Sequence, residues 1–261
     1  MHPLVLHMIR GFVPAGITLI MLVVLVTLGH WQGERLVWKQ NLQARIEARQ
    51  NLPPLKISNA EDIARLTAAQ HDYRRATIEG KSWQQAVFWF ARLHNFPTQK
   101  INRRDTIGYH VLVPLELADE SIILLDAGFI PQHIQADYVP PIMHNPQVIL
   151  RWPAPRALFD AADEPAQNLF YVRDPVAIGR HWGLVMPDFI GEKMASTKNW
   201  PQNWSNKAAP IAGQTRLTLP NRHFDYMLTW YGLAVVLVFI SGLWHMVHMR
   251  HVRSWINRAK G

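Results

Sequence analysis

The sequence predicts a membrane protein in which two transmembrane α-helices flank a mainly β (α+β) domain, built as an antiparallel sheet or a partly open barrel. Three observations predict this class. Two apolar blocks without formal charge lie near the ends of the 261 residues. Short β-rich runs follow one another between these blocks, and all 19 acidic residues also lie between them. This pattern is typical of a water-exposed domain held between two membrane helices.

The first apolar block covers residues 12–29 and reads FVPAGITLIMLVVLVTLG. At 1.5 Å per residue it spans about 27 Å, close to the hydrocarbon thickness of a bilayer. Pro14 falls in the first turn of this predicted helix, where a missing N–H costs little. A cleaved signal peptide is the alternative, with Arg10 as its basic region. The apolar core is longer than that of a usual signal peptide, which favours a retained helix.

The second apolar block covers residues 226–246 and reads YMLTWYGLAVVLVFISGLWHM, a span of about 31 Å. Aromatic residues typical of a membrane interface stand at both of its ends: Tyr226, Trp230 and Tyr231 at one end and Trp244 at the other. Four basic residues follow the block: Arg250, Arg253, Arg258 and Lys260. Because cytoplasmic flanks carry the excess of Lys and Arg, we expect the C-terminus to be cytoplasmic.

Two spans place the N-terminus on the same side as the C-terminus. The predicted organisation is a cytoplasmic N-terminus 1–11, a membrane helix 12–29, a periplasmic domain 30–225, a membrane helix 226–246 and a basic cytoplasmic tail 247–261. A mitochondrial import sequence would be longer than the stretch of residues before the first helix, and it would be rich in Arg and Ser. We therefore expect a multi-pass protein of the bacterial inner membrane.

The central domain opens with helical periodicity at 31–51, which continues the first membrane helix up to Pro53 and Pro54. A second helical segment is predicted at 60–69. The predicted strands are 75–83, 86–93, 109–117, 122–129, 147–152, 169–173, 183–189 and 214–219. Pro and Gly separate these runs and no helices alternate regularly with them, which favours antiparallel pairing.

Composition excludes several classes of function. The net charge of +8 arises largely beside the apolar blocks, and no basic stripe interleaves with exposed aromatics, so we expect no nucleic-acid partner. The absence of cysteine excludes disulfides, thiolate metal sites and iron–sulfur clusters. No Gly-x-Ser-x-Gly, His-Glu-x-x-His or phosphate-loop motif occurs, so the chain is predicted not to be an enzyme.

Thirteen histidines in a chain without cysteine make imidazole the available ligand for haem iron. His223 stands at the outer mouth of the second block and is followed by aromatic residues. An imidazole in this position can ligate the iron of a flat apolar macrocycle, which makes His223 a candidate ligand, with Trp230 and Tyr231 among the aromatic residues that follow it. His30 occupies the matching level of the first block, as a candidate second ligand. The alternative is that His223 and His30 are ordinary interfacial histidines.

Three further histidines, His245, His248 and His251, recur at every third position near the inner end of the second block. Residues three apart share a helix face, whereas residues six apart drift off it. A common metal site is therefore geometrically poor, and we interpret these three as interfacial residues of the basic flank.

Four ordered motifs resemble the Surfeit locus protein 1 family of cytochrome oxidase assembly factors. LGHWQGERLVWKQNL (28–42) is similar to the LGxWQxxRxxWKxxL opening of that family. IGYHVLVPLEL (107–117) with IILLDAGFIP (122–131), and NLFYVRDPVAIG (168–179), resemble its central elements. NRHFDYMLTWYGLA (221–234) matches the N-x-H-x-x-Y-x-x-T-W-Y/F-x-L-A signature. One departure is Asp126-Ala127, where the family usually has Asn-Arg, so a cation is lost at that strand end.

The resemblance implies an assembly factor for a haem-copper terminal oxidase, which binds haem a transiently and aids its insertion into the large catalytic subunit. It implies His223 as the ligand and the large catalytic subunit as partner, with the haem a-synthesising enzyme as a further partner and the lipid bilayer as surroundings. A second hypothesis is a structural scaffold that holds oxidase subunits without handling haem. A third, an enzyme with an unrecognised site, is disfavoured by the lack of clustered polar chemistry.

Overall fold

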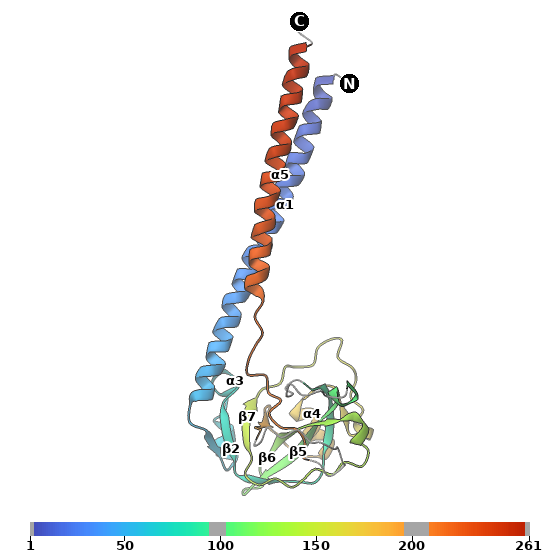
Figure 1. The fold of residues 1–261 in the computed structure, drawn as a ribbon. Coiled ribbons are helices and arrows are strands. Elements are labelled where there is room, and N and C mark those ends of the chain that lie inside the picture. The colour runs from blue at the N-terminus through green and yellow to red at the C-terminus, as the bar shows by residue number, and fades with distance from the viewer. Residues whose placement is uncertain (1–2, 94–102, 196–208, 259–261) are drawn as a thin grey trace. The chain divides into compact units, whose positions relative to one another are not determined.

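A computed structural model describes residues 3–93, 103–195 and 209–258 (Figure 1). The chain divides into two compact units. One unit joins Met1–Ala44 to Thr218–Gly261 and contains two long helices, and we call it the helix pair. The other unit, Arg45–Leu217, contains the β-strands, and we call it the sheet unit.

The helix pair consists of α1 (Pro3–Asn51) and α5 (His223–Arg258). In the described part of the chain, two segments are long and apolar enough to cross a membrane, Phe12–Asn51 and His223–His251, which is consistent with membrane association. The predicted helical continuation at 31–51 is confirmed, because α1 runs without a break to Asn51. Pro14 lies inside α1 and not in its first turn as predicted, because the helix begins at Pro3.

The two helices lie side by side and run in opposite directions (Figure 1). Ser241 donates a hydrogen bond from Oγ to Thr18 Oγ1 at 3.2 Å, whereas His223 lies against Gln32. The contact position in α5 therefore falls as the position in α1 rises, which is the signature of antiparallel packing. Between these levels Gly29 is buried, and a Cβ added to it would lie 2.8 Å from Tyr231 Cε1. Only glycine lets the two helices approach so closely there.

The sheet unit holds short strands connected by short helices and loops. In chain order its elements are β1 (Leu55–Ile57), α2 (Ala60–Ala64), α3 (Ala68–His71), β2 (Arg75–Ile78), β3 (Gly80–Ser82), β4 (Val87–Arg92), η1 (Arg103–Thr106), β5 (Ile107–Leu117), β6 (Ile122–Pro131), η2 (Gln132–Ile134), β7 (Gln147–Arg151), η3 (Pro165–Gln167), β8 (Leu169–Phe170), α4 (Pro175–Trp182) and β9 (Ile190–Lys193). The predicted helix at 60–69 is two short helices, α2 and α3.

The described strands form one nine-stranded sheet in the order β1-β2-β7-β9-β6-β5-β4-β8, with β3 paired to β5. The expectation of a purely antiparallel sheet is wrong, because the sheet is mixed. Three pairs are parallel: β1 with β2, β4 with β8, and β6 with β9. Alternation along a strand predicts which side chains are buried, but strand direction depends on where each connection returns the chain.

Four of the eight predicted strands are confirmed, namely 86–93 as β4, 109–117 as β5, 122–129 as β6 and 147–152 as β7. The run 75–83 is divided into β2 and β3, and 169–173 is shortened to β8. The strands β1 and β9 and the helix α4 were not predicted. Helix α4 is started by Asp174, whose carboxylate accepts hydrogen bonds from the N–H groups of Val176 and Ala177, and is ended by Gly183 at φ 70°.

Two predicted strands, 183–189 and 214–219, are wrong. In the first, side-chain burial does alternate, since Met186 is buried and Val185 is 95% exposed. The segment nevertheless joins no ladder, and strand pairing begins only at Ile190, the first residue of β9. In the second, Gln214 and Thr215 are adjacent and both buried, and no residue of 214–219 joins a ladder. Among the described residues 209–213 just before it, Ile211 alone makes a bridge, to Phe129 of β6.

The apolar core fills both faces of the central strands. On β5, Val111 and Val113 belong to one core cluster and Leu112 to the other. The same division separates Leu125 from Leu124 on β6. Because the two faces are both buried, β5 and β6 are nearly continuous apolar runs, and any polar side chain within them needs an internal partner.

Candidate functional site

His223 is the first residue of α5, and local capping determines its place. The Oδ1 atom of Asn221 accepts a hydrogen bond from the backbone N–H of His223 at 3.3 Å, and Pro220 precedes this cap. Asp225 lies in the first turn, where a negative charge interacts favourably with the helix dipole. The imidazole is thus carried on a defined helix end and is half-buried.

The His223 ring is oriented by α1. Its Nδ1 lies 2.7 Å from the side-chain Oε1 of Gln32. A carboxamide oxygen only accepts hydrogen bonds, so Nδ1 carries the proton and the lone pair is on Nε2. Within the described residues, Nε2 has no hydrogen-bond partner. Metal-ligating histidines are held in this same way, with one ring nitrogen donating to a fixed acceptor and the other facing the metal.

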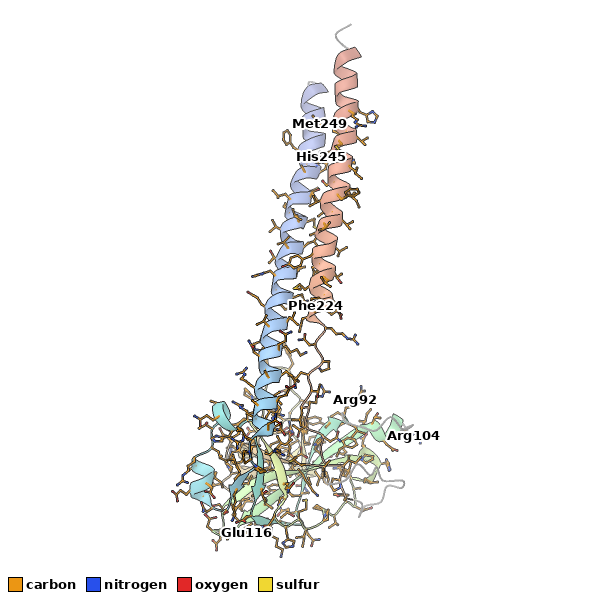
Figure 2. All side chains as sticks on the ribbon, turned by 60° about the vertical axis from the view of Figure 1, so that its left-hand side comes forward. Arg92, Arg104, Glu116, Phe224, His245 and Met249 are labelled. Carbon is orange, nitrogen blue, oxygen red and sulfur yellow. The ribbon has the colours of Figure 1, made fainter. Side chains whose placement is uncertain are left out.

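Trp230 and Tyr231, the other two predicted site residues, lie two turns farther along α5. Trp230 is half-buried, and its indole Nε1 is buried without a hydrogen-bond partner among the described residues. Tyr231 covers Gly29 with its ring and is 37% exposed. Phe224, labelled in Figure 2, and Tyr226 add rings that are about half exposed. The start of α5 therefore offers an accessible apolar surface, an imidazole lone pair and an unsatisfied indole donor.

These features fit a flat apolar macrocycle with a central metal. The imidazole supplies a nitrogen ligand, and the aromatic rings supply apolar contact area. The buried indole N–H of Trp230 is a donor for a polar substituent, since a buried donor without a partner is costly. Among the described residues no group of three His, Cys, Asp or Glu side chains is placed to hold a bare metal ion.

His30 does not lie beside His223. Its side chain is 76% exposed and its Nε2 is 3.6 Å from Oε1 of Glu34, on the same helix. The residue of α1 that reaches His223 is Gln32, two positions further along the chain. Residues two apart on a helix point in different directions. His30 therefore does not face His223, although the two residues lie at a similar level along the helix pair.

His245 and His248 lie toward the other end of α5 and contact Trp244. The His248 ring stacks on the indole at 5.0 Å between centroids, with 6° between the planes, and the His245 ring meets it edge-on at 4.9 Å. A shallow surface hollow beside them is lined by His245 and Met249, both labelled in Figure 2, together with Met246 and Arg250. The stacking accounts for these rings as aromatic interface residues.

A second polar site, not predicted from the sequence, lies inside the sheet unit. His110 of β5 donates from Nδ1 to the carboxylate of Asp126 on β6, with the shorter distance 2.7 Å to Oδ2. Both side chains are almost fully buried, with 6% and 3% of their surface exposed. Gly128 also donates its backbone N–H to Asp126 Oδ1 at 3.0 Å. We call the residues around this pair the buried polar cluster.

The buried polar cluster includes a second carboxylate and an arginine. Glu192 of β9 is the register partner of Asp126, so two buried carboxylates lie opposite each other on neighbouring strands. Like charges placed in this way repel. Arg173 bridges them, since its Nη1 lies 3.3 Å from Asp126 Oδ2 and 2.5 Å from Glu192 Oε1. Thr215 donates its hydroxyl to Glu192.

Aromatic packing completes the buried polar cluster. The guanidinium of Arg173 lies 4.3 Å from the ring centroid of Trp89, and the same indole meets His110 edge-on at 5.0 Å. Burial alone would raise the pKa of Asp126, but the adjacent His110 and Arg173 outweigh it and lower that pKa below its ordinary value. Asp126 is therefore ionised and fully paired, which is the arrangement of a structural network.

The sequence carried a signal for the buried polar cluster. Asp126 stands inside a continuous apolar strand, and Asp126-Ala127 replaces the Asn-Arg expected from the family resemblance. The structure shows that Asp126 lies in the middle of β6 and that a cation is still present beside it, supplied by Arg173. No pattern in the sequence connects residues 47 positions apart, so the pairing needed the fold.

Comparison with known proteins identifies the family. A family model described as the SURF1 family matches residues 19–235, well over half of the chain. The chain belongs to the SURF1 family. Surfeit locus protein 1 of Mus musculus is 28% identical over 239 residues, which cover 85% of this chain and 72% of the relative. Surfeit locus protein 1 of Homo sapiens is 28% identical over 240 residues, with 85% and 73% covered. The SURF1-like protein of Caenorhabditis elegans is 26% identical over 231 residues, with 80% and 67% covered.

The family match extends across both polar sites. It takes in Gln32 and His223 as well as the whole sheet unit, and it ends before His245 and His248. The family resemblance predicted from the motifs is thus confirmed. The residues assigned to haem a remain a prediction, and the helix pair supplies the geometry on which to test it.

Proposed function

We propose that this SURF1-family protein is a membrane-anchored assembly factor for a haem-copper terminal oxidase, and that it binds haem a through His223. The observation that carries the proposal is the His223–Gln32 hydrogen bond of 2.7 Å, which leaves the Nε2 lone pair without a partner among the described residues. A resting imidazole held by one neutral acceptor suits a site that must bind a group and then release it.

Haem a, when bound, supplies an iron that accepts a nitrogen lone pair. His223 offers that lone pair from Nε2, and Gln32 holds the tautomer and the ring direction. Trp230 offers its indole N–H, while Tyr231 and the exposed rings at the start of α5 exclude water from an apolar face. His223 is the only residue of this chain proposed as a protein ligand.

The proposal includes a topology. α1 and α5 cross the bacterial inner membrane at residues 12–29 and 226–246, and both termini are cytoplasmic. Four basic residues after α5's apolar block support this orientation through the positive-inside rule. The domain between the spans is then periplasmic, and it contacts the large catalytic subunit of the oxidase, with the haem a-synthesising enzyme as a further partner. The protein turns nothing over in this role.

A direct test compares purified wild type with His223→Ala after growth with haem a available. We expect the wild type to carry haem a, and the variant to lose at least about 90% of it, because the ligand nitrogen is removed. His30→Ala is the control, since it removes an imidazole from the same helix pair, one that is 76% exposed and does not lie beside His223. Equal haem occupancy in wild type and His223→Ala would overturn the ligand assignment.

The alternative function is a scaffold that holds oxidase subunits without handling haem. The exposed aromatic rings and the sheet edges would serve partner contact equally well under that hypothesis. Oxidase assembly in a strain that carries only His223→Ala distinguishes the two. Normal assembly with a haem-free variant favours the scaffold, whereas assembly that stalls before haem insertion favours the haem role.

A further inference from the structure

A row of three large side chains on α1 faces away from α5. Trp31, Arg35 and Trp38 are spaced four and three residues apart, so they share one helix face. Trp31 is 45% and Trp38 50% exposed. The residues of α1 that contact α5 in the same turns are Gln32 and Gly33, which lie on another face. We call the three residues the Trp-Arg-Trp face.

The three side chains of the Trp-Arg-Trp face contact one another. The guanidinium carbon of Arg35 lies 5.8 Å from the ring centroid of Trp31 and 5.7 Å from that of Trp38. Both distances are within the range of a cation–π contact, so the cation is held between two rings. A rigid helix carries all three residues, and ordering them in advance lowers the entropic cost of binding.

The cation of this face lacks an anion. Within the described residues, Arg35 makes no ion pair and no hydrogen bond, whereas the adjacent Glu34 is turned to His30. Arg35 is permanently charged, so its natural counterpart is a carboxylate or a phosphate. Trp and Arg are also the residue types that contribute most to binding at protein interfaces.

The position of Arg35 along α1 decides whether its anion is a lipid phosphate or a protein carboxylate. This step rests on the proposed membrane crossing. At 1.5 Å per residue, Arg35 lies about 9 Å and Trp38 about 14 Å beyond Gly29, the end of the apolar block. The headgroup layer on each side of a bilayer is only about 6 Å thick. Trp31 therefore reaches lipid headgroups, but Trp38 lies beyond them and stays uncovered by lipid.

We propose that the Trp-Arg-Trp face is a docking site for a second membrane protein, whose segment just outside the bilayer presents an Asp or Glu beside apolar side chains. The carboxylate pairs with Arg35, and the apolar side chains cover the outer faces of Trp31 and Trp38. The face lies on a different side of α1 from Gln32, so docking leaves the His223 ring free to bind haem.

The test places a photo-crosslinking benzophenone side chain at position 38 of the full chain, in native membranes. We expect a crosslink to one membrane protein, mapped by mass spectrometry to a segment that holds Asp or Glu. Introducing Arg35→Glu should lower the yield about tenfold or more, as for loss of an interface hot spot. Arg45→Glu, the same charge change at an exposed position ten residues away, should leave the yield unchanged.

Four outcomes would overturn the proposal. They are adducts with lipid alone, adducts only with a second copy of this chain, an internal crosslink to residues 45–217, and a yield that is insensitive to Arg35→Glu. The identity of the captured protein separates this proposal from the proposed function. If the captured protein is an oxidase large subunit, the result supports both the docking face and the proposed function. If a different membrane protein is crosslinked through its acidic segment, the result supports the docking face and contradicts the oxidase as the partner.

Discussion

His110 and His223 are both held by a hydrogen bond from Nδ1, yet their surroundings differ. His110 lies within the sheet, donates to a carboxylate, and belongs to a network in which Asp126, Glu192 and Arg173 are all paired. His223 is half-buried, donates to a neutral carboxamide, and has an Nε2 without a partner among the described residues. A satisfied buried network stabilises a fold, whereas a half-satisfied accessible ring is free to bind.

The difference predicts where a single substitution unfolds the protein and where it only changes binding. We expect Asp126→Ala to give the largest effect, a loss of about 3–5 kcal/mol in the free energy of unfolding, because it breaks a buried ion pair from one side. Arg173 then retains one carboxylate and His110 loses its acceptor. Denaturant titration of the detergent-solubilised full chain, followed by tryptophan fluorescence, measures the change.

Asp119→Ala is the matched control for that substitution. Asp119 accepts a hydrogen bond from the backbone of Ala60 but lies at the surface, so its loss should cost far less. A loss below about 1 kcal/mol for Asp126→Ala would show that the buried polar cluster is not a stabilising network. His110 would then not differ from His223 by a role in stabilising the fold.

The next effect concerns the other histidine. Gln32→Ala removes the acceptor that orients His223 and should weaken haem a binding about 10–100-fold, the usual cost of losing a hydrogen-bond partner of a metal ligand. Titration with haem a, followed by its visible absorption, measures the affinity. Gln32→Glu keeps an acceptor oxygen and should retain binding. Equal affinity in wild type and Gln32→Ala would mean that the ring is positioned by something else.

Acid should affect the sheet unit through Asp126. The pKa of Asp126 is lowered in the folded protein, from an ordinary value of 3.8. A carboxylate of this kind contributes stability that is present above the unfolded pKa and is lost as pH falls through the folded pKa. We therefore expect stability to decline below about pH 4. Asp126→Asn, which cannot titrate, should reduce that decline, and an identical acid profile in the variant would contradict the assignment.

The two regions also differ in how far the sequence predicted them. The helix pair carries strong local signals, namely charge-free apolar blocks and helical periodicity at 31–51, and these required no knowledge of pairing. The central strands β5 and β6 were predicted for the same reason, since their apolar runs are local. Strand direction, the true extent of β8 and the existence of β9 depend on contacts between distant segments, and the sequence did not predict them.

The sites follow the same rule. His223 was selected because it stands next to an apolar block and a group of aromatic residues, which are neighbours in sequence. Its partner Gln32 is 191 positions away in the sequence. Gln32 faces His223 and His30 does not, because the two residues of α1 point in different directions around the helix axis. The polar groups of the buried polar cluster come from three strands and two loops, and Trp89 adds a fourth strand. The sequence contained only one sign of this cluster, an aspartate in an apolar strand.

The smallest expected effect is that of His30→Ala, which tests whether a second histidine at the level of His223 contributes to haem a binding. His30 matches His223 in residue type and in level along the helix pair, yet its ring is 76% exposed and faces Glu34 on its own helix. An exposed pair of this kind contributes little to stability. We therefore expect haem a affinity within about twofold of wild type, since no shared ligand is removed. Titration under the conditions used for Gln32→Ala measures it, and Glu34→Ala serves as the control for the lost ion pair. A tenfold loss in His30→Ala alone would show that α1 rotates to present a second ligand, and a site with two imidazoles would hold haem too firmly for simple transfer.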